Sequence, residues 1–167
     1  MRIALIGMPT SGKSTIANLL TKNSNYALID LDALLEKKFQ MTLQNFINLE
    51  GEVEFIKQEN SLMKSIKYPK DSIISTGGSV VYATEAMEQL KSIGVHFVYL
   101  KVPINILETR LANQRDMRGI VMNGASTWNE LLIDRDHLYC KYADTIITVE
   151  DQTAQDICNL IKKDLMK

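Results

Sequence analysis

The sequence predicts an α/β fold in which one parallel sheet is covered by helices on both faces. Apolar runs of strand length alternate along the chain with helical patterns, and this alternation is typical of parallel sheets with helical crossovers. Because both faces of such a sheet are buried, its strands are nearly continuous apolar runs. We expect five strands, at 2–6, 26–30, 72–76, 95–101 and 145–149.

The first strand leads into the most specific motif of the chain, a phosphate-binding loop. Residues 7–14 read Gly-Met-Pro-Thr-Ser-Gly-Lys-Ser, a complete G-x-x-x-x-G-K-[ST] pattern between a strand-like and a helix-like run. The glycines let the backbone curl so that successive N–H groups point at a phosphate, and the helix N-terminus adds its positive dipole. In this pattern Lys13 reaches the outer phosphates, and the Ser14 hydroxyl is placed to ligate Mg²⁺.

Two carboxylates follow the second strand. Asp30 and Asp32 lie where the strand 26–30 ends and a helix begins, at the edge where parallel α/β sheets bind ligands. One role for Asp32 is a helix cap, since Asp is common at that position. Beside a phosphate loop, however, we favour a functional pair. One carboxylate then holds the water shell of Mg²⁺, and the other orients or deprotonates an acceptor hydroxyl.

Residues 31–70 hold about three consecutive helical segments, which is more than one crossover between strands needs. We expect this insertion to be a substrate-binding region at the active edge of the sheet. The third strand, 72–76, then ends at Gly77 and Gly78. These glycines therefore lie at the same edge as the phosphate loop.

A long polar segment, 112–126, follows the fourth strand and a helical stretch. A loop of this length in a compact domain is usually a lid or a mobile surface loop. Its arginines Arg115 and Arg118 favour a lid, because phosphoryl transfer depends on charge stabilisation and exclusion of water.

The helix over 127–142 carries an arginine on its apolar stripe, which consists of Leu131, Arg135, Leu138 and Tyr142. A buried arginine is costly unless it is paired or binds an anion. Arg135 therefore either grips an anionic group such as a carboxylate or forms a structural salt bridge to Asp32 or Glu54.

The chain ends with the strand 145–149 and a helix, in which Ile157, Leu160, Ile161 and Leu165 share one face. All 167 residues together are 46% hydrophobic and 23% charged, so we expect one domain over 1–167 with its own core. The net charge of −1 offers no basic footprint for nucleic acid or an anionic membrane. Two cysteines without metal-type spacing, and no signal or membrane-spanning segment, indicate a cytoplasmic protein without nucleic-acid or membrane partners.

These motifs together resemble the shikimate kinase family, a group of small P-loop kinases related to nucleoside-monophosphate kinases. The resemblance covers essentially the whole chain and depends on residues 7–14, 30–32 (Asp-Leu-Asp), 50–55 (Glu-Gly-Glu-Val-Glu-Phe), 75–78 (Ser-Thr-Gly-Gly), 118–121 (Arg-Gly-Ile-Val) and 135–139 (Arg-Asp-His-Leu-Tyr). It implies a three-layer α/β/α P-loop fold with a five-stranded parallel sheet. It also implies a helical substrate-binding region over 31–70 and a lid over 112–126.

The resemblance further implies ATP and Mg²⁺ as cofactors and a role for each site residue. Lys13 and Arg118 would stabilise the transferring phosphoryl group, and Asp32 would contact the acceptor hydroxyl as the candidate base. Ser14 would bind Mg²⁺ directly, and Asp30 would do so through water. The acceptor would lie on Gly77, Gly78 and Arg135. Nucleotide contacts would come from Gly7, Pro9, Thr10, Ser11, Gly12, Lys13, Ser14, Thr15, Gln152 and Arg110, the last stacking on adenine.

Three positions depart from the family pattern. Members carry an arginine directly after the E-G-E-x-x-F run, which grips the substrate carboxylate, whereas this chain has Ile56. Lys57 points about 100° away on a helix, and Ile56 aligns with Val53, Asn60 and Met63, which is compatible with a core role. Ser79 replaces a third glycine and Gly119 replaces the lid proline. The nucleotide half of the site is therefore complete, and the acceptor half is altered.

We expect a monomeric enzyme that uses ATP to phosphorylate a hydroxyl of a small anionic metabolite, with shikimate as the best single acceptor. One alternative is a related kinase for another hydroxy acid or polyol. A second is a nucleotide-binding protein that has lost catalysis, against which the complete set of Lys13, Ser14, Asp30, Asp32 and Arg118 argues. A nucleoside-monophosphate kinase fits less well, because 31–70 lacks the arginines expected for a second phosphate. The sequence leaves open whether Asp32 is a base or only positions the hydroxyl, since a loose transition state needs little base help.

Overall fold

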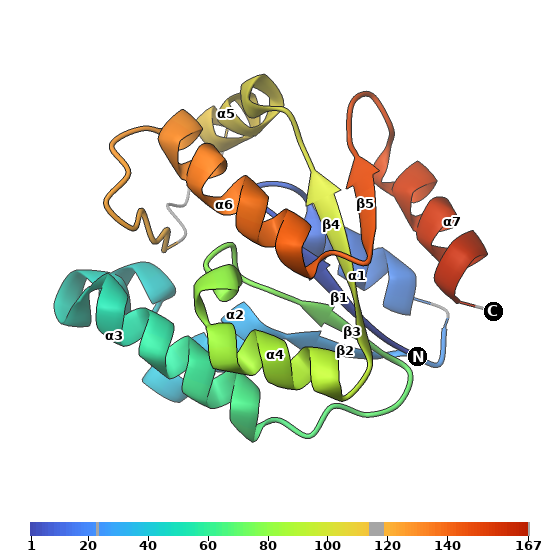
Figure 1. The fold of residues 1–167 in the computed structure, drawn as a ribbon, viewed down its shortest axis with the longest axis horizontal. Coiled ribbons are helices and arrows are strands. Elements are labelled where there is room, and N and C mark those ends of the chain that lie inside the picture. The colour runs from blue at the N-terminus through green and yellow to red at the C-terminus, as the bar shows by residue number, and fades with distance from the viewer. Residues whose placement is uncertain (23, 114–118, 167) are drawn as a thin grey trace.

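The computed structural model describes residues 1–22, 24–113 and 119–166, and these form a five-stranded parallel sheet (Figure 1). The strand order is β2-β3-β1-β4-β5, so that β1 with its following loop lies at the centre. The strands are β1 (Arg2–Ile6), β2 (Ala27–Asp30), β3 (Ser72–Ser75), β4 (Val95–Lys101) and β5 (Thr145–Thr148). Each lies within one residue of the range expected from the sequence, and every pairing is parallel.

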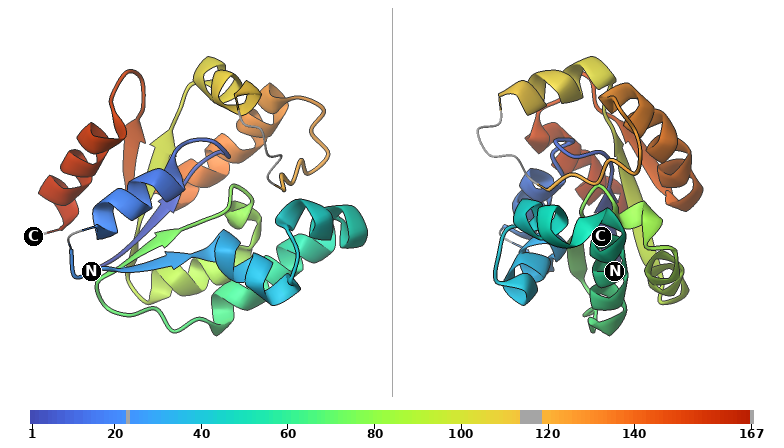
Figure 2. Two further views of the ribbon diagram at one scale, coloured as in Figure 1. Left: turned by 180° about the vertical axis from the view of Figure 1, so that it is seen from behind. Right: turned by 90° about the vertical axis from the view of Figure 1, so that its left-hand side faces the viewer.

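Helices cover both faces of the sheet, which confirms the three-layer α/β/α architecture. On one face α1 (Lys13–Thr21) packs beside α7 (Ala154–Leu165), and the opposite face carries α4 (Thr84–Ser92) and α6 (Trp128–Tyr142) (Figure 2). The remaining helical elements are α2 (Leu31–Phe39), α3 (Leu43–Ser65), the 3₁₀ turn η1 (Val80–Tyr82) and α5 (Ile104–Ala112). No helix in the described part of the chain is both long enough and apolar enough to cross a membrane.

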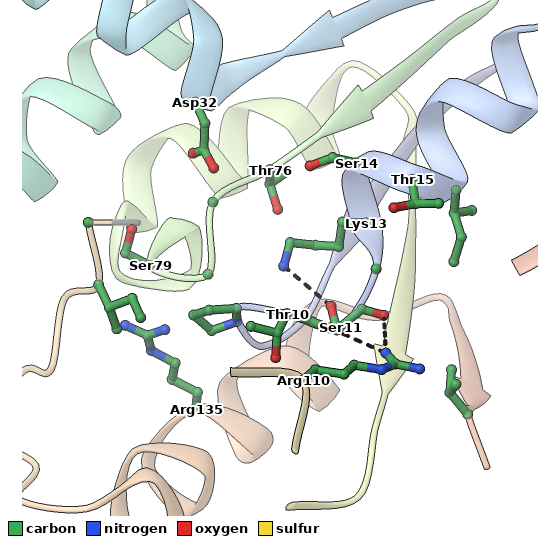
Figure 3. A pocket seen from close by; sticks show the side chains of 18 of the residues that line it. Thr10, Ser11, Lys13, Ser14, Thr15, Asp32, Thr76, Ser79, Arg110 and Arg135 are labelled. Atoms are coloured by element: carbon green, nitrogen blue, oxygen red, sulfur yellow. Dashed lines mark hydrogen bonds between the residues drawn. The ribbon is translucent and has the colours of Figure 1, made fainter. Parts of the chain in front are cut away.

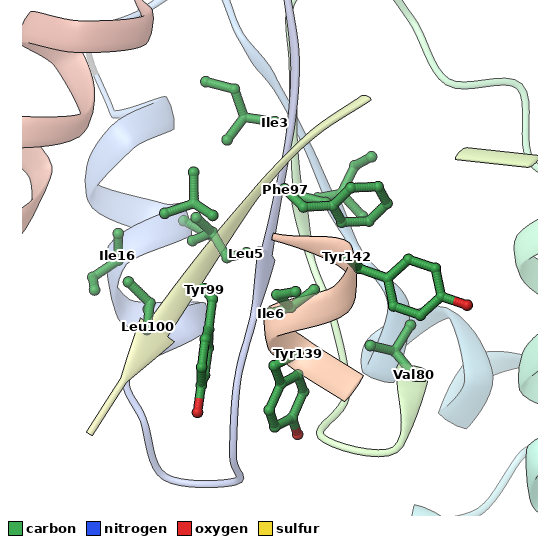
Figure 4. Packing of buried hydrophobic residues seen from close by; sticks show 14 of the residues in the cluster. Ile3, Leu5, Ile6, Ile16, Val80, Phe97, Tyr99, Leu100, Tyr139 and Tyr142 are labelled. Atoms are coloured by element: carbon green, nitrogen blue, oxygen red, sulfur yellow. The ribbon is translucent and has the colours of Figure 1, made fainter. Parts of the chain in front are cut away.

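The main core lies around the central strands. All side chains of β1 from Ile3 to Ile6 are fully buried, as expected for a strand covered on both faces. On the α6 side the Tyr99 and Tyr139 rings lie 4.9 Å apart between their centroids, and Phe97 packs against Tyr142 (Figure 4). The edge strands are less covered, since Leu28 of β2 and Ile146 of β5 are 39% and 48% exposed.

The segment between β2 and β3 consists of three helical pieces, as the sequence predicts for 31–70. They are α2 and the two halves of α3, which is interrupted at Gly51 by a left-handed backbone (φ 84°) that glycine tolerates best. These pieces surround a second, smaller core of Leu35, Leu43, Ile47, Phe55 and Val121. Because Val121 belongs to this core, part of the segment 112–126 packs on the α2–α3 region.

Two predicted helical stripes differ in part from the faces that are buried. In α7, Cys158 is buried and donates its thiol to the Ile16 carbonyl, whereas Leu160 is 44% exposed. In α6 the third buried position is Tyr139, while Leu138 is only partly buried. The reason is geometrical: neighbouring positions at i+3 and i+4 both fall near the same face, and the packed partner decides which is buried.

Candidate functional site

A cavity of about 470 Å³ opens at the carboxyl ends of the central strands, where parallel α/β sheets bind ligands. The phosphate loop, the start of α2, the Gly77–Gly78 turn, α5 and α6 surround it (Figure 3). Thirteen of the predicted site residues line this one cavity: Pro9, Thr10, Ser11, Gly12, Lys13, Ser14, Thr15, Asp32, Gly77, Gly78, Arg110, Arg135 and Gln152. Gly7 and Asp30 do not line it, and Arg118 lies outside the described residues.

The phosphate loop depends on two glycines with positive φ. A Cβ on Gly7 (φ 146°) would lie 2.8 Å from the Leu100 carbonyl oxygen, so only glycine lets the loop pass this close to β4. Gly12 adopts φ 99° directly before α1. The first turn of α1 contains no acidic residue, and its N-terminal N–H groups and dipole therefore favour an anion in the loop.

The ammonium group of Lys13 lies inside this curl. Its Nζ donates to the carbonyl oxygens of Gly7 and Met8, each at 2.8 Å, and the side chain is buried. Gly7 therefore contributes to the site through its carbonyl rather than by lining the cavity. The geometry holds a cation where the outer phosphates of a nucleotide in this loop would lie.

Arg110 reaches the loop from α5. Its Nη1 donates to the carbonyl oxygens of Thr10 at 3.2 Å and Ser11 at 3.4 Å (Figure 3). Beyond this guanidinium the cavity wall includes Gln152 and the apolar side chains of Ile16, Val149, Ala154 and Ile157. A planar, largely apolar ring such as a nucleobase suits this end of the cavity.

The residues predicted to hold Mg²⁺ lie together at the strand ends. Ser75 Oγ donates to Ser14 Oγ at 3.4 Å, and Ser75 is the register partner of Asp30 across β2 and β3. Asp30, rather than Asp32, is the N-cap of α2, because its Oδ1 accepts the Ala33 N–H at 3.2 Å. The oxygen donors fit a hard cation that keeps several waters. Within the described ranges no group of three acidic, His or Cys side chains forms a closed metal site.

Arg135 lies at the other end of the cavity and is fully buried. Its guanidinium donates from Nε to the Tyr82 hydroxyl at 3.2 Å and from Nη2 to the Val121 carbonyl. Arg135 forms no salt bridge with a described residue, and Glu54, one suggested partner, binds Lys57 and Gln58 instead. Nη1 has no hydrogen-bond partner, which favours the anion-binding role over the structural salt bridge.

Gly77 and Gly78 leave space at the end of the cavity where Arg135 lies, because they carry no Cβ. A Cβ on Gly78 would lie 2.9 Å from Arg135 Nη1 and 2.7 Å from the Pro9 ring, and a Cβ on Gly77 would lie 2.9 Å from Asp32 Oδ1. The backbone of this turn therefore passes directly between the arginine, the aspartate and the phosphate loop. Tyr139 of α6 stabilises this turn, because its hydroxyl donates to the Gly78 carbonyl at 2.6 Å.

Glu59 was not among the residues that sequence reasoning selected. It projects from α3, is fully buried, and accepts the Ser79 hydroxyl at 2.9 Å through Oε2. Burial and the nearby Asp32 raise the pKa of the Glu59 carboxyl to about 8. One signal was available: Glu59 lies four residues from both Phe55 and Met63, so it interrupts an apolar stripe.

The described part of the segment 112–126 is attached to α3. The Glu52 carboxylate accepts the backbone N–H groups of Met122 at 2.6 Å and Asn123 at 2.8 Å. A Cβ on Gly119 would lie 2.6 Å from the Leu43 carbonyl carbon, so the backbone at 119 also packs closely on α3. Gly119, Ile120 and Val121 all line the cavity.

Comparisons with known proteins identify the family. A family model described as shikimate kinase matches residues 9–166. The chain belongs to the shikimate kinase family. A shikimate kinase of Clostridium botulinum (strain Okra / Type B1) is 36% identical over 147 residues, covering 87% of this chain and 85% of that protein. A shikimate kinase of Lactococcus lactis subsp. lactis (strain IL1403) is 34% identical over 166 residues, covering 98% and 97%.

Solved structures of shikimate kinases superpose along the whole chain. The shikimate kinase from Acinetobacter baumannii in complex with shikimate has a TM-score of 0.83 and 26% identity, and the match covers 99% of this chain and 95% of that one. A deoxyadenosine kinase from M. mycoides matches at a TM-score of 0.61 and 15% identity. The latter likeness concerns the fold alone, since P-loop kinases with different acceptors share this architecture.

The departures from the shikimate kinase pattern can now be placed. Ile56 is partly buried against the smaller core and does not line the cavity, as the predicted core role requires, although Val53 is 83% exposed. Lys57 is exposed and pairs with Glu54 at 3.4 Å, so it does not replace the missing arginine. Ser79 does line the cavity and adds a hydroxyl to its wall.

Proposed function

We propose that this protein transfers the γ-phosphoryl group of ATP to a hydroxyl group of shikimate. The observation that carries the proposal is the buried Arg135 Nη1, which faces the same cavity as Asp32 and the phosphate loop. A buried guanidinium that has one nitrogen without a hydrogen bond, and no salt bridge to a described residue, suits an acceptor with a carboxylate. Membership of the shikimate kinase family, and a solved relative in complex with shikimate, support this choice of acceptor.

The residue roles follow from where negative charge develops during phosphoryl transfer. Lys13 and the helix α1 N-terminus stabilise the transferring phosphoryl group, and Arg118 adds a second cation from the lid. Asp32 orients the acceptor hydroxyl and takes its proton as the oxygen attacks phosphorus and the bond to ADP breaks. Arg135, with the Gly77–Gly78 backbone, holds the acceptor carboxylate so that the hydroxyl faces the γ-phosphate.

The nucleotide and the metal use the other half of the cavity. We propose that residues 7–15, Arg110 and Gln152 bind ATP, and that Ser14, with Asp30 through water, holds Mg²⁺. The metal would neutralise charge on the phosphates. In this proposal 31–70 is the acceptor-binding region and 112–126 is the lid of a single domain over 1–167. The free cysteines support a cytoplasmic enzyme, and we propose a monomer because the resemblance to the family implies one.

A second acceptor class has one observation in its favour. Ile56 occupies the position of the arginine that the family pattern places in the substrate site, and Ser79 adds a hydroxyl to the cavity wall. Arg135 and Asp32 would therefore also suit a hydroxy acid whose shape differs from that of shikimate. Such an acceptor still requires a carboxylate for Arg135. A neutral polyol fits this half of the cavity less well, because a buried guanidinium would then have no counter-charge.

The decisive experiment is ADP release from Mg-ATP with and without shikimate, measured by chromatography. We expect a shikimate-dependent rate of about 1–100 s⁻¹, the usual range for kinases. The Lys13→Ala protein serves as the control for contaminating kinases. If the rate with shikimate does not exceed the ATP-only blank, shikimate is not the acceptor, and other hydroxy acids are then assayed in the same way.

A further inference from the structure

A buried carboxyl group lies directly behind the acceptor wall of the cavity. Glu59 is fully buried and does not line the cavity itself. Its Oε2 accepts the Ser79 hydroxyl at 2.9 Å, and Ser79 does line the cavity. The other oxygen, Oε1, has no hydrogen-bond partner. Ionisation of this buried carboxyl group costs free energy, because Oε1 has lost its hydration without gaining a hydrogen-bond donor.

The groups that face Glu59 do not neutralise it. From α2 it faces Asp32, from the turn after β3 it faces Ser79, and from α6 it faces Arg135 and Tyr139. Arg135 is the cation of this set, and its guanidinium is hydrogen-bonded to Tyr82 and Val121 rather than to Glu59. No salt bridge between described residues includes Glu59. On its own helix the adjacent turn carries Ile56, where a cation could have paired with it.

Glu59 and Asp32 also approach the same point. A Cβ on Gly77 would lie 3.0 Å from Glu59 Oε1 and 2.9 Å from Asp32 Oδ1. Two carboxyl groups that share one site do not both ionise readily. Asp32 borders the cavity, whereas Glu59 is enclosed, so burial favours the proton on Glu59.

We propose that Glu59 is a positioning residue of the acceptor site that carries its proton during catalysis, holding the Ser79 hydroxyl while leaving Asp32 as the charged carboxylate. This inference rests on the proposed transfer to an anionic acceptor. When Glu59 is neutral, the charged groups that the structure describes at this end of the cavity are Arg135 and Asp32. Ionisation of Glu59 adds a second anion beside Asp32, and this anion repels the carboxylate of the acceptor. Acceptor affinity should therefore fall when Glu59 loses its proton, while the chemical step changes less.

The test is the pH dependence of KM and kcat for shikimate in wild type, Glu59→Gln and Ser79→Ala. For wild type, KM should rise above about pH 8, by up to tenfold per pH unit for a single proton. Glu59→Gln imitates the neutral acid, so its neutral-pH KM should stay within about threefold of wild type and the alkaline rise should disappear. The Ser79 hydrogen bond lowers the pKa of Glu59, so in Ser79→Ala the rise should move to higher pH. Glu50→Gln, on an exposed position of α3, is the matched control.

Two results would overturn the inference. One is a Glu59→Gln protein that folds but loses acceptor affinity at neutral pH by tenfold or more, which would mean that the ionised carboxylate is required. The other is an unchanged alkaline rise in that variant. If the variant does not fold, carbon-13 NMR of glutamate carboxyl carbons in wild type decides: one should titrate near pH 8, and none doing so rejects the proposal. Absence of any shikimate-dependent ADP release instead rejects the proposed function, while the NMR titration still tests the proton on Glu59.

Discussion

Individual residues at the acceptor end of the cavity carry the difference between this chain and its family. Arg135 donates to the Tyr82 hydroxyl and to the Val121 carbonyl, and its buried Nη1 has no hydrogen-bond partner. Ile56, at the position of the second family arginine, packs into the smaller core. In the proposed function Arg135 is the guanidinium that binds the acceptor carboxylate, and the consequences can be measured at single positions.

Replacement of Arg135 by lysine should weaken acceptor binding specifically. Lysine keeps the charge but lacks the planar fork, so at least one charged hydrogen bond to the acceptor is lost, at a cost of about 1.5–3 kcal/mol. We expect KM for shikimate to rise about ten- to a hundredfold, with KM for ATP nearly unchanged. Steady-state kinetics with each substrate varied in turn provide the check. An unaltered shikimate KM would show that Arg135 is only structural.

Replacement of Lys13 by alanine should abolish turnover without unfolding the protein. The ammonium group is the described cation inside the phosphate loop, and removal of one such stabilising group lowers kcat by about 10²–10³ or more. ADP release measures the loss, and circular dichroism reports the fold. Lys37→Ala, on an exposed position of α2, is the control and should keep full activity. Normal turnover in Lys13→Ala would contradict the kinase assignment.

At the scale of elements, α3 is attached to the described part of the segment 112–126. Its carboxylate Glu52 accepts two backbone N–H groups from Met122 and Asn123, and its N-terminal turn packs on Gly119. Val121, in between, completes the smaller core and binds Arg135 through its carbonyl. Movement of this segment is therefore linked to the shape of the acceptor site.

Loss of the Glu52 carboxylate should release this segment. In Glu52→Ala the two N–H groups lose their charged acceptor, each bond being worth about 1.5–3 kcal/mol at most. We expect faster amide hydrogen exchange at Met122 and Asn123 and a severalfold higher KM for the acceptor. The neighbouring, exposed Glu50→Ala should change neither quantity. Unchanged exchange at both amides in Glu52→Ala would mean that other contacts hold the segment.

Elements were predicted better than their contacts. The five strands and the three helical pieces of 31–70 follow from local patterns of apolar residues and glycine, so the sequence located them. The choice of Cys158 over Leu160 as a buried position depends on the packing of α7 against α1. Similarly, the positions of Ser75 and Glu59 at the site depend on hydrogen bonds to residues that lie 61 and 20 positions away along the chain. A single sequence carries no local signal for such pairs.

At the scale of the whole molecule, the buried acid links stability to pH. The pKa of Glu59 is raised to about 8 in the folded protein, whereas in the unfolded chain it returns to its ordinary value. Between these values the folded state binds one more proton than the unfolded state, so stability falls as pH rises, by up to about 1.4 kcal/mol per pH unit, and levels off above the folded value. The opposite slope is expected of carboxyl groups whose pKa is lowered on folding.

Urea unfolding near pH 6 and pH 8 measures this effect. We expect wild type to lose about 2 kcal/mol of unfolding free energy over that interval. Glu59→Gln, which has no proton to lose, should be nearly flat and more stable than wild type at the higher pH. Equal slopes for the two proteins would show that Glu59 does not titrate in this range.

The placement of the α2–α3 region has a consequence for how acceptor binding can be altered. This region leaves the sheet at β2 and returns at β3, and these two strands are hydrogen-bonded neighbours at one edge. The nucleotide end depends instead on β1, α1, α5 and the start of α7. Residues 31–66 therefore supply one part of this end of the cavity, and Gly77, Gly78 and Arg135 supply the rest. We expect exchange of 31–66 for the same stretch of a relative to alter the KM of the acceptor while the KM of ATP stays nearly unchanged.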